Sequence, residues 1–116
     1  MNSEFITLEQ LTNILSQWHG KQVTISKVEM DDYDEVFMQL EDITYQSESN
    51  HLDPYEPSFT LQLEGTGKIY TDHGQYEELP SSSYEIPLQK SALYEYDGQQ
   101  FLISTERGTY KISIHR

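Results

Sequence analysis

The chain has 116 residues, no cysteine, and a formal net charge of −13 from seven basic and twenty acidic residues. This length fits a single domain over residues 1–116; the missing cysteines exclude disulfides and thiol chemistry, and the charge disfavours binding to nucleic acid or an anionic membrane. No apolar run approaches the roughly 20 residues that span a bilayer, and the N-terminus lacks the layout of a secretory signal, so we expect a cytoplasmic protein.

The first predicted element is an amphipathic helix that begins after Thr7. Thr7 and Gln10 have the spacing of a capping box, and Gly20 suits a left-handed C-cap. Apolar residues recur between them at helical spacing. They are Leu8, Leu11, Ile14, Leu15 and Trp18. A helix of about three turns is marginal alone in water, so we expect this one to pack on a face of a sheet.

Alternating apolar residues predict β-strands from Val23 onward. The alternation changes parity near 26–27 and again near 41–42, which predicts a β-bulge at each place. The acidic segment 31–34 has the composition of a turn. Two long, bent strands on either side of that turn are typical of a strongly curved sheet.

Less regular segments follow. Residues 46–58 are predicted to form a long polar loop, and 59–63 alternate as a strand. Gly65-Thr66-Gly67 is predicted to turn the chain, residues 75–83 to be irregular, and Pro87 to mark an edge strand because proline cannot donate to a ladder.

The last third of the chain predicts a three-strand meander. Asp97-Gly98 is a hairpin signal, and Arg107-Gly108 is a second candidate turn. Two-residue loops there pair Tyr94 with Phe101 and Ile103 with Ile112. A four-residue loop over 106–109 would give the second hairpin the same register. The face they share would hold Tyr94, Phe101, Ile103, Ile112 and Ile114. The meander could also expose an edge at 109–115 for pairing with a second copy.

Together these patterns predict an α+β fold that is mostly β. The N-terminal amphipathic helix would pack on a curved antiparallel sheet or partial barrel of about six to eight strands, because short turns between neighbouring strands imply antiparallel pairing.

The negative charge is concentrated in the middle of the chain. No Lys or Arg lies between Lys27 and Lys68, whereas eleven acidic residues do. Such a field attracts basic partners, and tyrosine is enriched at interfaces. The predicted contact residues are Asp31, Asp32, Tyr33, Asp34, Glu35, Tyr55 and Glu56. The alternative is that the charge only keeps the protein soluble.

Motifs for catalysis or cofactors are absent from the sequence: it has no glycine-rich phosphate loop, no G-x-S-x-G and no H-E-x-x-H. His51, Asp53 and Glu56 lie close together but do not match a calcium loop. We therefore predict a non-enzymatic interaction module, monomeric or homodimeric, that binds a basic protein and needs no metal or cofactor. The alternative is a small-ligand-binding domain with a tyrosine-lined pocket inside a partial barrel.

Overall fold

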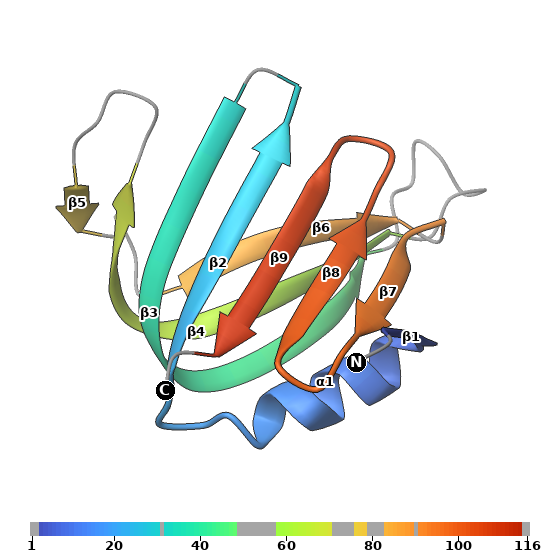
Figure 1. Ribbon diagram of the computed structural model, residues 1–116, viewed down its shortest axis with the longest axis horizontal. Coiled ribbons are helices and arrows are strands. Elements are labelled where there is room, and N and C mark those ends of the chain that lie inside the picture. The colour runs from blue at the N-terminus through green and yellow to red at the C-terminus, as the bar shows by residue number, and fades with distance from the viewer. Residues whose placement is uncertain are drawn as a thin grey trace.

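The computed structural model describes residues 3–30, 32–48, 58–70, 76–78, 83–89 and 91–114 (Figure 1). The described elements are one helix and nine strands. In chain order they are β1 (Glu4–Ile6), α1 (Leu8–Ser16), β2 (Gln22–Glu29), β3 (Asp32–Glu48), β4 (Ser58–Tyr70), β5 (Tyr76–Glu78), β6 (Ser83–Gln89), β7 (Leu93–Tyr96), β8 (Gln100–Ser104) and β9 (Thr109–Ile114). The predicted fold class, α+β and mostly β, is confirmed.

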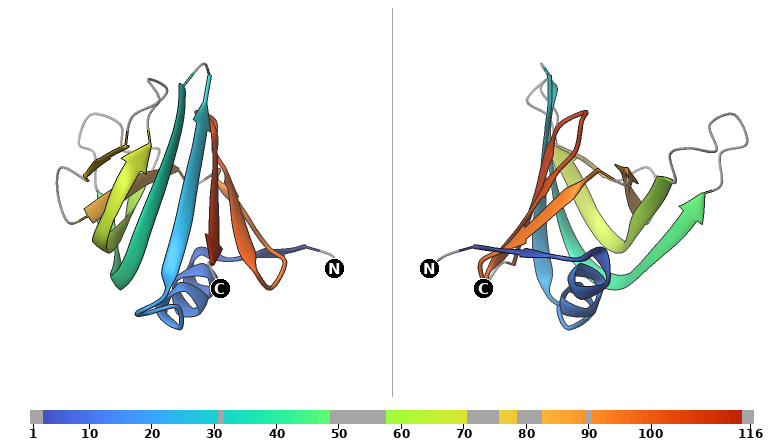
Figure 2. Two further views of the ribbon diagram at one scale, coloured as in Figure 1. Left: turned by 60° about the vertical axis from the view of Figure 1, so that its left-hand side comes forward. Right: turned by 90° about the vertical axis from the view of Figure 1, so that its right-hand side faces the viewer.

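The strands form one antiparallel sheet in the order β1-β7-β8-β9-β2-β3-β4-β5, with β6 also paired to β4. The sheet curves back on itself, so that β4 and β6 cross behind β2 and β9 (Figures 1 and 2). Among the described residues its two ends do not pair, so the sheet is open. Within the described part of the chain β6 pairs only with β4, which confirms the edge position of Pro87. Because β9 lies between β8 and β2, the predicted edge at 109–115 is wrong.

The helix is held by local signals and by the core. Thr7 Oγ1 accepts from the Gln10 amide at 3.1 Å, and the Thr7 amide donates to Gln10 Oε1 at 2.9 Å, which confirms the capping box. Leu11 and Leu15 are fully buried, and the Trp18 ring lies 5.0 Å from that of Phe101. The helix therefore closes one end of the curved sheet (Figure 2).

β3 is the strand that links the two layers of the sheet. Its pairing with β4 shifts register between Leu40 and Asp42, which confirms the second predicted bulge. The bulge predicted near 26–27 is wrong, because β2 pairs with β3 over its whole length without a shift. The turn predicted at 31–34 is also wrong in extent: Glu29 already pairs with Asp32, so Asp32 to Asp34 belong to the strand.

Gly65 and Gly67 lie inside β4 and do not form the predicted turn. The backbone of β3 approaches them so closely that a Cβ on Gly65 would collide with the carbonyl oxygen of Gln39, and one on Gly67 with that of Phe37. Glycine in a strand often marks such a close approach. Of the segment predicted to be irregular, Tyr76 to Glu78 form β5.

The predicted meander is present as β7, β8 and β9, with a register that differs by two residues in both hairpins. Tyr94 pairs with Ile103, and Phe101 pairs with Ile112. A shift of two keeps every side chain on its face. The predicted inward face is therefore confirmed: these four side chains are buried and Ile114 is half-buried against them.

Side-chain caps explain the longer hairpin loops. Asp97 Oδ1 accepts from the amides two and three residues later, both at 2.9 Å, and these bonds hold the pKa of its carboxyl below the ordinary value. Thr105 Oγ1 accepts from the corresponding amides of the second loop at 3.2 and 3.1 Å. Each loop thus spans four residues, 97–100 and 105–108. The prediction used two residues for the first loop, and either two residues or the four at 106–109 for the second.

Candidate functional site

Four of the seven predicted contact residues occupy the first four positions of β3. They are Asp32, Tyr33, Asp34 and Glu35. The other three, Asp31, Tyr55 and Glu56, lie outside the described residues. Because successive side chains on a strand point to opposite faces, the four described residues do not form one cluster.

Tyr33 and Glu35 lie on the outer face of the sheet. The Tyr33 hydroxyl donates to Glu35 Oε2 at 2.7 Å, and this hydrogen bond raises the pKa of the tyrosine. Across the hairpin Tyr33 pairs with Val28 of β2. Val28 is 50% exposed, Tyr33 38% and Met30, in the connection between the strands, 94%.

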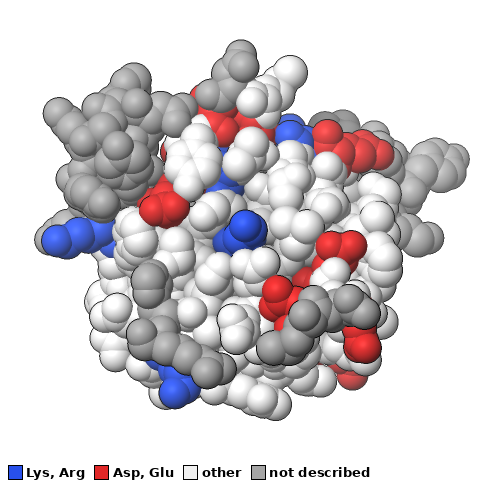
Figure 3. Space-filling model, viewed as in Figure 1, with Lys and Arg blue, Asp and Glu red and all other residues white. Residues whose placement is uncertain are grey.

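The hairpin projects beyond its neighbours in the sheet. The pairing of β9 with β2 ends at Val28, and that of β4 with β3 ends at Glu35. We call Val28, Glu29, Met30, Asp32, Tyr33 and Glu35 together the hairpin end. Val28, Tyr33 and Glu35 lie on its outer face, whereas Glu29 and Asp32 lie on its inner face. Acidic side chains gather over this part of the molecule in Figure 3.

Asp34 points to the inner face and is neutralised there. Its Oδ2 lies 3.1 Å from Lys27 Nζ, and both side chains are about a quarter exposed, at 26% and 22%. Burial lowers the pKa of Lys27, but the hydrogen bond and charge of Asp34 outweigh it, so the pKa lies above its ordinary value. Asp34 is therefore bound within the fold and is not free to meet a partner.

Two tyrosines join this ion pair at the end of the sheet opposite α1. Tyr110 of β9 is 4% exposed and Tyr84 of β6 is half-buried. Burial raises the pKa of both hydroxyls, and both interact electrostatically with Asp34. Our sequence reasoning missed this group, although the alternation along β2 places Lys27 on the inward parity with Val23 and could have indicated it.

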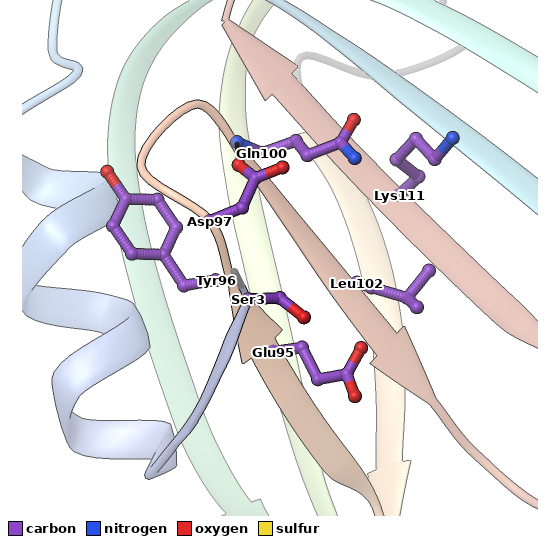
Figure 4. A pocket seen from close by; sticks show the side chains of 7 residues that line it. All are labelled: Ser3, Glu95, Tyr96, Asp97, Gln100, Leu102 and Lys111. Atoms are coloured by element: carbon purple, nitrogen blue, oxygen red, sulfur yellow. Dashed lines mark hydrogen bonds between the residues drawn. The ribbon is translucent and has the colours of Figure 1, made fainter. Parts of the chain in front are cut away.

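Hollows also lie elsewhere on the surface of the described residues. One of about 350 Å³ borders β1 and β7–β9 (Figure 4). A second of about 410 Å³ lies over β2, β3 and β4, and a third of about 120 Å³ lies between α1 and β3. Tyr96, beside the first, is the one tyrosine that lines any of the three.

The described residues contain no group of three His, Asp or Glu side chains that could hold a metal ion. Within the same residues, no helix has the length and apolar character needed to cross a membrane. The hairpin end presents exposed apolar side chains and carboxylates, which are groups that can contact another molecule.

Comparison with known proteins places the chain in a family. The family model described as YmzB-like protein matches residues 4–116. The uncharacterized protein YmzB of Bacillus subtilis (strain 168) is 32% identical over 110 residues, which cover 86% of this chain and 92% of that protein. No solved structure matches. This chain therefore belongs to the family of YmzB-like proteins.

Proposed function

We propose that this protein is a non-enzymatic interaction module that docks a basic partner protein through the hairpin end. The observation that carries the proposal is the juxtaposition of Val28, Met30 and Tyr33, all exposed, with three carboxylates on a projecting two-stranded tip. Protein interfaces combine an apolar centre with a polar rim, and exposed apolar groups rimmed by polar ones mark interaction sites.

The backbone conformation of Met30 supports this proposal. Its φ of 52° lies in the left-handed region, and it is the one non-glycine residue with a positive φ in the part of the chain that the structure describes. That conformation is unfavourable for a residue with a Cβ atom, other than asparagine or aspartate. Met30 is also 94% exposed, so its side chain buries almost no area within the fold, and strained residues concentrate at functional sites.

The chemistry of the hairpin end defines the partner. Glu35 lies on the same face as Val28 and Tyr33, and Glu29 and Asp32 pair with each other on the opposite face of the same tip. These carboxylates call for Lys or Arg on a partner that surrounds the tip, and Met30 calls for an apolar pocket. Methionine is common at binding surfaces because its thioether is flexible and polarisable. A complex of this kind should weaken as ionic strength rises.

The test is capture of partners from a bacterial lysate on the immobilised protein at low salt, followed by washes of rising salt and mass spectrometry. One variant removes the rim charge (Glu29→Gln, Asp32→Asn and Glu35→Gln). The matched control removes three exposed charges elsewhere (Glu41→Gln, Glu85→Gln and Glu106→Gln). Both variants have the same net charge.

The proposal expects a specific basic protein that the wild type and the control retain and the hairpin variant loses. Met30→Asn should also lose it. If the control loses the protein equally, or if only a broad mixture of basic proteins is captured, the acidic side chains serve solubility and the proposal fails.

A further inference from the structure

The outer face of β7, β8, β9 and β2 is neutral in a chain whose net charge is −13. On these four strands, which are described in full, the only outward-facing charged side chains are Glu95 and Lys111. Figure 3 shows the region over β9 and β2 as largely uncharged. Net charge opposes self-association over most of the surface, but it does not do so here.

The two charges stand symmetrically about an apolar residue. Leu102 pairs with Glu95 on one side and with Lys111 on the other. Figure 4 shows the three side chains pointing to the same side of the sheet. Neighbouring strands lie about 5 Å apart, so the Cα atoms of Glu95 and Lys111 lie at roughly equal distances from that of Leu102, in opposite directions.

We propose that a second copy of this chain packs on this face, about a two-fold axis that runs parallel to β8. Such a rotation places the two Leu102 side chains against each other. It also places Glu95 opposite the partner subunit's Lys111, and Lys111 opposite the partner subunit's Glu95. A two-fold interface must be complementary to itself, and an acid–apolar–base row meets that condition.

Exposed apolar side chains extend the row. Phe5 of β1 pairs with Glu95 and is 68% exposed, and Leu93 lies two residues before Glu95 on the same face and is 56% exposed. Both would be covered by the second copy. The inference does not depend on the proposed function, because the row and the hairpin end share no residue.

The test is sedimentation equilibrium of the full chain over a concentration series. Glu95→Lys makes both charges of the row positive, and Lys111→Glu makes both negative. Each variant alone should raise the dissociation constant of the dimer at least about tenfold, because like charges then face each other twice per dimer. An equimolar mixture of the two variants should restore the dimer, and this restoration requires that both are folded.

Matched controls carry the same changes of net charge on β6 and β4. Glu85→Lys and Lys68→Glu should leave the dissociation constant unchanged. Three results overturn the inference: a wild type that stays monomeric at about 1 mM, where even a weak dimer would form; a dimer that does not respond to the reversals; or reversed variants that do not associate with each other.

Discussion

Replacing Met30 with asparagine should make the protein more stable. A φ of 52° costs a residue with a Cβ about 1 kcal/mol, whereas asparagine enters the left-handed region readily and is favoured in two-residue hairpin turns. Because Met30 is 94% exposed, its removal loses almost no buried area. We therefore expect the free energy of unfolding to rise by about 1 kcal/mol, which raises the Tm of a chain of this size by about 4 °C.

Urea unfolding followed by the fluorescence of Trp18, which is 7% exposed, measures this change. The matched control is Met30→Ala, which keeps a Cβ in the left-handed conformation and should change the free energy of unfolding by less than about 0.5 kcal/mol. Equal effects of the two substitutions would refute the argument from backbone strain. A loss of stability on Met30→Asn would show that the methionine side chain supports the fold.

Three further predictions concern the fold. Gly65→Ala should lower the free energy of unfolding by more than about 2 kcal/mol, because the new Cβ collides with the β3 backbone. Gly20→Ala, with φ of 82° and no atom within 4 Å of the new Cβ, should lower it by about 1 kcal/mol. Urea unfolding measures both changes, and equal losses would contradict the close approach of β3 to Gly65. Thr7→Ala should cost about 1 kcal/mol by removing the helix cap; no loss in the same assay would show that the capping box is dispensable. Burial raises the pKa of Tyr84, so this hydroxyl ionises in the unfolded chain before it does in the folded protein. The stability that it contributes is therefore present below about pH 10 and is lost as pH rises further. Tyr84→Phe should make the free energy of unfolding fall less steeply above about pH 10, and an unchanged pH profile would contradict this reasoning.

The elements that sequence reasoning predicted correctly are those whose signals are local. The capping box at Thr7 and the apolar spacing that follows it are close together in the chain and indicate the same helix. The C-cap predicted at Gly20 is wrong, because α1 ends at Ser16 and Gln17 is its C-cap. The register of the meander was predicted with a two-residue error, because the cap made by Asp97 lengthens the loop. The set of inward-facing side chains was still predicted correctly, because the side chains of a strand alternate with a period of two.

The errors came from contacts between distant segments. Gly65 and Gly67 have the composition of a turn, and only the approach of β3 shows why glycine is needed inside β4. β1 was missed altogether, because a strand of three residues has too short a pattern to be recognised and forms by pairing with β7.

At the candidate site, the order of acidic residues in the sequence predicted their arrangement in the structure only in part. The run Asp32 to Glu35 is consecutive in the chain, but a strand distributes it over two faces: Asp34 is paired with Lys27 inside, and Glu35 accepts from Tyr33 outside. A turn predicted to begin at Met30 would have placed Lys27 opposite Asp34 and so predicted the ion pair. Met30 gives no turn signal, because methionine is not among the residue types that favour a positive φ. The positive φ and the 94% exposure of Met30 are the observations on which the proposed docking at the hairpin end rests, because a strained and exposed residue is typical of functional sites.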